Sequence, residues 1–269
     1  MITRESFFQY FKYGIYILLT INFYFFFTED LEAFSIRYPN GIALGQIINA
    51  YATTIDTVSW LALLWILELE TYYLEDEQIT PLITMVFLII KAICYSFIIY
   101  SFFGYCASLA FYYNTTSFQV TDLCSLVNEN WSYSQMINEY SPISSENCSL
   151  LSTANEFVRF GNTNAIVDTA GSKDIIWLGW VDIINSGVWI IVVFIIELNI
   201  KLQEKNIHQN FSLKLSRFNQ YFLYPILFVN AFYWGLEGDF VDFWDAFLWL
   251  VAFFFIELNI IQWRDENIE

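Results

Sequence analysis

Long apolar runs alternate with short polar segments along this chain. A membrane-spanning helix needs about 20 mainly apolar residues, because it crosses about 30 Å of hydrocarbon at about 1.5 Å per residue. Runs of roughly this length recur along the chain, and the pattern predicts six transmembrane helices. We expect these helices at residues 6–27, 47–70, 81–112, 176–200, 216–235 and 242–262.

One polar segment is much longer than the others. Residues 113–174 are rich in Ser, Asn, Thr and Glu, whereas the remaining connections are short. We therefore predict an all-α integral membrane protein, with six helices in three repeated hairpins and an extracytoplasmic loop inserted in the second hairpin. The expected parts are a first hairpin (1–76), a third helix (77–112), an extracytoplasmic subdomain (113–174), a fourth helix (175–204) and a third hairpin with a short cytoplasmic tail (205–269).

A short phrase recurs in every second predicted helix. It is WLALLWILELE at 60–70, WIIVVFIIELN at 189–199 and WLVAFFFIELN at 249–259. Each copy begins with Trp, and after seven residues it continues with Glu, Leu, and then Glu or Asn. Local sequence that returns at a regular position is typical of internal repetition. The phrase therefore favours three related hairpins.

The phrase also places Glu68, Glu197 and Glu257 inside predicted membrane helices. An ionised carboxylate is costly there, so such residues normally face protein or water. Three interpretations stay open. The glutamates form a ring that attracts cations or relays protons, or they pair with basic side chains of neighbouring helices, or they only reach the lipid headgroups. The candidate basic partners are Lys12, Lys91 and Arg217.

Two aspartates precede the phrase at a constant distance. Asp182 and Asp242 each lie seven residues before the Trp of their helix. One interpretation places them near the outer entrance of an ion or proton pathway. The other makes them N-caps, whose carboxylates accept hydrogen bonds from the free N–H groups of a helix start.

Composition supports a membrane protein and excludes one class of partner. The chain is 57% hydrophobic and only 14% charged, whereas about a quarter of the residues in a soluble domain are charged. The net charge is −17, and a nucleic-acid partner requires clustered Lys and Arg. We expect the lipid bilayer as a partner, together with further copies of the chain or other membrane proteins, and no nucleic acid.

Basic residues and cysteines suggest an orientation. Lys and Arg near the predicted helix ends, such as Arg4 and Lys201, fall on one side, which the positive-inside rule makes the cytoplasm. Both termini are then cytoplasmic and residues 113–174 lie outside, in a bacterial inner membrane or an equivalent one. Because Cys124 and Cys148 both lie in that outer segment, we predict a disulfide between them.

No enzymatic signature accompanies these features. The sequence has no Walker loop and no GxGxxG, GxSxG, HExxH or CxxC motif. We therefore expect a protein that is not an enzyme and has no cofactor or resident metal, with a hard cation bound by carboxylates alone left open. The leading hypothesis is transport or conduction of a proton or small cation through the intramembrane glutamates. The alternative is a structural or accessory subunit, with the glutamates as buried salt-bridge or hydrogen-bond partners.

Overall fold

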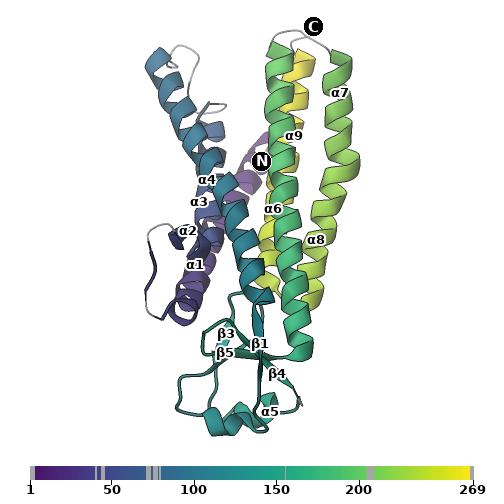
Figure 1. Ribbon diagram of the computed structural model, residues 1–269. Coiled ribbons are helices and arrows are strands. Elements are labelled where there is room, and N and C mark those ends of the chain that lie inside the picture. The colour runs from purple at the N-terminus through teal and green to yellow at the C-terminus, as the bar shows by residue number, and fades with distance from the viewer. Residues whose placement is uncertain are drawn as a thin grey trace. The chain divides into compact units, whose positions relative to one another are not determined.

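The chain forms two compact units (Figure 1). Unit 1 comprises Met1–Phe25 and Asn185–Glu269, and unit 2 comprises Phe26–Ile184. The structure is a computed structural model of residues 1–269. It describes residues 4–39, 41–43, 46–70, 74, 78, 80–154, 156–204 and 209–266, without the side chains of 4–8, 200, 203–204, 209–213 and 254–266.

Helices account for most of the chain. Their bounds are α1 Arg4–Arg37, α2 Ile47–Ala50, α3 Ala52–Glu68, α4 Pro81–Tyr113, α5 Cys148–Leu151, α6 Thr169–Glu204, α7 Gln209–Phe218, α8 Tyr224–Glu237 and α9 Phe240–Glu266. A short 3-10 helix, η3, covers Leu123–Leu126, and a π-helical segment, η4, covers Asn219–Leu223 between α7 and α8. The helices α1 and α6 extend well beyond the ends that their apolar runs predict.

Three of these helices are long and apolar enough to cross a membrane, within the part of the chain whose placement is described. The candidate spans are Gln9–Arg37 in α1, Pro81–Tyr113, which is α4, and Thr169–Asn199 in α6. They confirm that the protein is suited to a membrane. The prediction of six spanning helices is wrong, and the plan of three repeated transmembrane hairpins is wrong with it.

Breaks in the helices explain part of this difference. The predicted helix at 47–70 is interrupted at Tyr51, and its longer piece, α3, has 17 residues and a length of about 26 Å, short of the hydrocarbon thickness. The predicted helix at 216–235 is divided by η4, so that α8 has only 14 residues. The second half of the predicted helix at 242–262 lies outside the residues whose side chains are described.

The long polar segment contains a five-stranded sheet, so the all-α prediction is also wrong and the fold is mixed α/β. Its strands are β1 Thr115–Phe118, β2 Ser132–Ser134, β3 Tyr140–Pro142, β4 Phe157–Phe160 and β5 Ala165–Asp168. They lie in the order β1-β4-β5-β2-β3. All neighbours are antiparallel except β2 and β5, which are parallel. We call this region the sheet subdomain.

Each face of the sheet is covered by its own apolar cluster. Side chains alternate between the faces of a strand, so Ile166 joins one cluster while Ala165 and Val167 join the other. The first cluster contains residues of η3 and α5, including Leu123 and Cys148. The second joins the sheet to the end of α4 and the start of α6, through Tyr112 and Ile175 among others.

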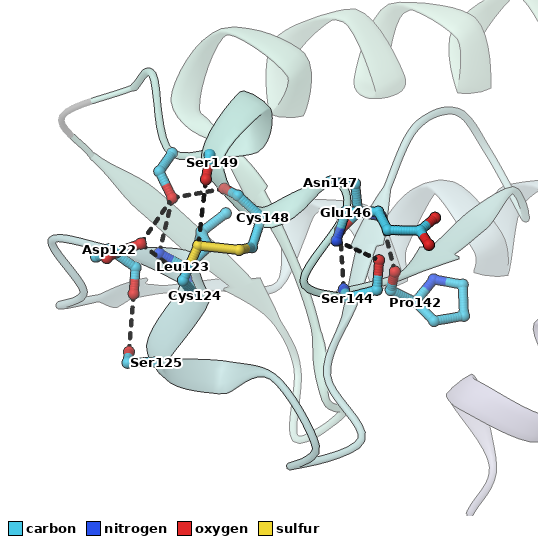
Figure 2. The surroundings of a disulfide bond; sticks show 11 residues. Asp122, Leu123, Cys124, Ser125, Pro142, Ser144, Glu146, Asn147, Cys148 and Ser149 are labelled. Carbon is cyan, nitrogen blue, oxygen red and sulfur yellow. Dashed lines mark hydrogen bonds between the residues drawn. A yellow bond between two sulfur atoms is a disulfide. The ribbon is translucent and has the colours of Figure 1, made fainter.

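The predicted disulfide between Cys124 and Cys148 is confirmed. It links η3 to the first residue of α5, with a Cα–Cα distance of 4.9 Å. Figure 2 shows how its surroundings are fixed. The Asp122 carboxylate accepts a hydrogen bond of 2.8 Å from the Cys124 backbone N–H and thereby caps η3. The disulfide therefore joins η3 to α5, the two helical segments that cover one face of the sheet.

An arginine and a buried tyrosine attach the sheet subdomain to the helices of unit 2. Arg37, in the last turn of α1, donates from Nη1 to the Asn138 Oδ1 at 2.9 Å, and its guanidinium lies 4.6 Å from the centre of the Phe111 ring in α4. The fully buried Tyr112 hydroxyl accepts from the Asn138 backbone N–H at 2.8 Å and lies 3.1 Å from the Tyr140 hydroxyl. We call these residues the Arg37 junction.

Aromatic side chains mark the level at which α4 and α6 meet the sheet subdomain. Trp177 is 64% exposed and Trp180 is 42% exposed, and the Trp180 indole N–H donates to the Tyr113 hydroxyl at 3.2 Å. Amphipathic Trp and Tyr rings concentrate at the interface between membrane and water. We call this part of unit 2 the aromatic level.

Candidate functional site

The most deeply buried carboxylate among the described side chains is that of Asp30 in α1, which is 1% exposed. It accepts hydrogen bonds from the Thr54 backbone N–H at 2.9 Å and from the Thr54 hydroxyl at 2.7 Å. Thr54 lies in the first turn of α3, whose N-cap residue Tyr51 makes no side-chain capping bond. The Asp30 carboxylate therefore caps α3 from a neighbouring helix and lies at the positive end of its dipole.

A second polar contact lies in the same unit. Tyr105 of α4 donates its hydroxyl proton to the Asp56 carboxylate of α3 at 3.3 Å. The carboxylates of Asp56, Asp182 and Asp30 all interact electrostatically with Tyr105, which also shares a side-chain hydrogen bond with Thr53.

Four helices of unit 2 thus contribute to one site: α1 supplies Asp30, α3 supplies Asp56, α4 supplies Tyr105 and α6 supplies Asp182. We call these four residues the aspartate–tyrosine cluster. Asp182 is only two residues from Trp180 of the aromatic level. The cluster therefore lies near the end of the helices that carries the sheet subdomain. Carboxyl and phenol groups can pass a proton between them.

The three expected glutamates do not all belong to one unit. Glu68, the last residue of α3, is buried at 2% exposure and belongs to unit 2. Glu197 lies in α6 within unit 1 and is half-buried. The side chain of Glu257 lies outside the described residues. The predicted convergence of these glutamates therefore stays a prediction.

The basic candidates also differ from one another. Lys91 of α4 forms an ion pair with Glu70, with 2.5 Å between Nζ and Oε2, so its acidic partner comes from the second acid of the repeated phrase. Lys12 is buried at 6% exposure and its ammonium lies 4.9 Å from the centre of the Tyr13 ring. Arg217 is exposed, in the last turn of α7.

The two predicted N-cap aspartates do not occupy cap positions. Asp182 lies in the interior of α6. The first N–H groups of this helix are capped by Asp168 instead, whose Oδ1 accepts hydrogen bonds from the Ala170 N–H at 2.8 Å and the Gly171 N–H at 3.0 Å. Asp242 lies in the first turn of α9, and its backbone N–H donates to Asp239 Oδ1 at 3.1 Å. In both helices the capping acid precedes the helix, because only there does its carboxylate reach the free N–H groups.

Unit 1 contains a polar contact of its own. Asn22 of α1 donates from Nδ2 to the Asp245 Oδ1 of α9 at 2.9 Å, and Asp245 also shares a hydrogen bond with the Trp249 side chain one turn later. Asp56 and Asn185 lie four residues before Trp60 and Trp189, as Asp245 does before Trp249. This recurring position thus supplies polar groups in both units.

Comparison with protein-family models, with curated proteins and with solved structures gave no match to this chain. In the part of the chain that the structure describes, no group of three His, Cys, Asp or Glu side chains is arranged to hold a metal ion. The chemistry of the site therefore has to be argued from the residues themselves.

Sequence reasoning missed Asp30 and Tyr105. Asp30 lies in TEDLEAFSIR, which follows the apolar run of α1 and resembles a polar connection. The helical spacing of Phe26, Asp30 and Ala33, all buried on one face, is a signal that could have revealed that α1 continues. Tyr105 carries no comparable signal, because tyrosine is common in this chain and usually serves in packing.

Proposed function

We propose that this protein is an integral membrane protein that moves protons, or small cations, through carboxylate side chains sheltered within its helices. The observation that carries the proposal is the aspartate–tyrosine cluster, in which the Tyr105 hydroxyl donates to the Asp56 carboxylate of another helix and two further carboxylates, from two more helices, act on it electrostatically. Ionisable groups at membrane depth are costly, and they commonly serve ion pathways or proton relays.

The chemistry of the cluster favours protons over larger species. A carboxylate accepts a proton, and a phenol both donates and accepts one, so Asp56 and Tyr105, already hydrogen-bonded, form one step of a relay. Asp182 lies beside the aromatic level, where it would exchange protons with water. Glu68, the buried last residue of α3 in the same unit, is proposed to continue the pathway at the other end of the helices.

The orientation proposed with this function places the sheet subdomain outside. A disulfide persists in an oxidising compartment, and the Cys124–Cys148 bond therefore supports an extracytoplasmic position for the subdomain, such as the bacterial periplasm. The basic residues Arg4 and Lys12 at the start of α1 favour a cytoplasmic N-terminus.

Proton flux into liposomes tests the proposal. The purified chain is reconstituted, a potassium gradient with valinomycin sets the membrane potential, and a pH-sensitive dye reports proton entry. We expect flux in the wild type and its loss in Asp56→Asn, Asp182→Asn and Tyr105→Phe. Asp122→Asn is the matched control, because it also removes a carboxylate but lies in the sheet subdomain. Absence of proton flux in the wild type, together with absence of sodium and potassium flux measured without valinomycin, refutes the proposal, and so does equal flux in all variants.

A second candidate function is that of an accessory subunit in a larger membrane assembly. It is favoured by α4, whose most apolar stretch is only 11% buried, against 33% in α1 and 28% in α6. So apolar a helix surface suits another membrane protein as well as it suits lipid. Extraction in mild detergent followed by mass spectrometry separates the candidates: a stoichiometric companion supports the subunit, and a single species that conducts protons supports transport.

A further inference from the structure

The buried face of the helices in unit 1 contains asparagine amides with unpaired polar atoms. Asn219 is 1% exposed, and neither its Oδ1 nor its Nδ2 has a hydrogen-bond partner among the described residues. The Nδ2 of Asn230 and the Oδ1 of Asn199 are in the same condition, at 7% and 8% exposure. A buried amide group without a partner destabilises a fold by about 1–3 kcal/mol, so three such side chains require an explanation.

The amides belong to regular buried stripes. Asn219, Leu223, Leu227 and Asn230 are all buried on η4 and α8, at spacings of three or four residues that align them on one face. The two amides bound this stripe, about 16 Å apart at 1.5 Å per residue. On α6 the buried residues Val188, Val192, Ile195 and Asn199 follow the same spacing. The stripe of α6 therefore also ends in an amide.

Asn219 also lies where the helix backbone departs from α-helical pairing. It begins η4, and the Tyr224 N–H bonds to the Asn219 carbonyl across a widened π turn. Pro225 follows at once, and proline has no N–H to donate to the preceding turn. Single π turns of this kind accommodate such interruptions and occur frequently at functional sites. The Asn219 side-chain amide thus lies beside a π turn, where backbone polar groups depart from regular α-helical pairing.

We propose that these amides bind internal water, with one site at Asn219 and a second at Asn230, one at each end of the buried leucine stripe. The unpaired atoms of Asn219 include both a donor and an acceptor, and the side chain is enclosed. A partner must therefore be small and must both donate and accept hydrogen bonds, which is the chemistry of water. The inference stands apart from the proposed transport through unit 2, because structural water would bind whether or not protons move.

Hydroxyl-radical footprinting of the wild-type protein in lipid nanodiscs tests the proposal. Radicals generated by a millisecond X-ray pulse modify side chains that adjoin ordered internal water, even where bulk solvent is excluded. We expect Leu223 and Leu227 to be modified several-fold faster than Leu64, a leucine of α3 that is equally buried at 3% exposure. Equal, slow modification of all three leucines overturns the proposal.

The near-isosteric variants Asn219→Leu and Asn230→Leu provide a second arm. If the amides bind water, each variant loses the rapid modification of the neighbouring leucine and has a lower Tm. If the amides lie in a dry core, removing an unpaired polar group raises Tm and leaves the footprint unchanged, which also overturns the proposal. The wild-type comparison decides the question even where a variant does not fold. Proton flux that is absent while the footprint is present would refute the proposed function and leave this inference intact.

Discussion

Removal of the Arg37 side chain should uncouple the sheet subdomain from the helices of unit 2. The perturbation is Arg37→Met, which keeps the apolar stem and deletes the guanidinium. That group donates to Asn138 Oδ1 at 2.9 Å and more weakly to Ser108 Oγ at 3.4 Å, and it lies 4.6 Å from the centre of the Phe111 ring. These contacts join the end of α1 to α4 and to the loop between β2 and β3.

The magnitude follows from these contacts. A hydrogen bond from a charged group contributes about 1.5–3 kcal/mol, and a cation–π contact contributes about 0.5–2 kcal/mol according to its exposure. Arg37 Nε is buried without a partner, which offsets part of this gain. We therefore expect Arg37→Met to lower the free energy of unfolding by about 2–3 kcal/mol, from these same contributions.

The assay is thermal unfolding in detergent, followed both by circular dichroism of the helices and by limited proteolysis of the sheet subdomain. In the wild type the two transitions should coincide, and in Arg37→Met the sheet subdomain should become sensitive to protease near Asn138 before the helices unfold. The matched control is Arg159→Met, which removes an arginine whose bonds to the Asn162 and Thr163 carbonyls are local to the β4–β5 hairpin. Unchanged stability and coincident transitions in Arg37→Met would refute the junction.

Three further predictions concern the disulfide, the close approach of other helices to α4 at Gly104, and the loss of stability at low pH. Cys124→Ser removes the bond between residues separated by 24 in sequence and should cost the subdomain about 3–4 kcal/mol on the loop-entropy model, measured by pulse proteolysis in denaturant. A wild type that is equally stable with and without reductant, or a variant as stable as the oxidised wild type, would contradict it. Gly104→Ala places a Cβ 2.8 Å from the Ala52 Cβ and 3.2 Å from the Ile48 carbonyl oxygen, so it should destabilise by about 1–3 kcal/mol, whereas Gly14→Ala, with nothing within 4 Å, should not. Burial alone would raise the pKa of Asp168, but hydrogen bonds from Tyr133 and from the Gly171 and Ala170 N–H groups outweigh it and lower the pKa. The stability that Asp168 contributes is therefore present above its unfolded pKa of about 3.9 and is lost as the pH falls through the lower folded pKa. The free energy of unfolding, measured as a function of pH, should show this loss in the wild type and not in Asp168→Asn.

The sequence predicts membrane character well because that property depends only on composition and local apolar length. It could not predict the sheet, because the strands have three or four residues each and their pairing joins segments far apart in the chain. Only FVRFGNTNAIVD carried a local hairpin signal, in which two apolar segments flank a Gly- and Asn-rich turn and Gly161 has a positive φ of 50°. SYS and YSP offer no comparable pattern.

The candidate site was predictable only in part. Asp182 is a candidate because it lies at a fixed distance from a repeated Trp, and in the structure its carboxylate interacts electrostatically with Tyr105. The interpretation of Asp182 as an N-cap is wrong, because α6 begins 13 residues earlier, at Thr169. The start of α6 is set by the β5 strand that leads directly into it, and the length of the apolar run does not reveal that connection. The disulfide was predictable because it required only two cysteines in one polar segment.

The direct passage from β5 into α6 has a practical consequence for imaging. The strand ends at Asp168 and the helix begins at Thr169, so no linker separates the centre of the sheet from a candidate membrane span. An antibody fragment that binds the sheet subdomain would consequently have little freedom to rotate relative to the helices of unit 2. Such a complex would give a small membrane protein the mass and the fixed landmark that particle alignment in electron cryomicroscopy requires.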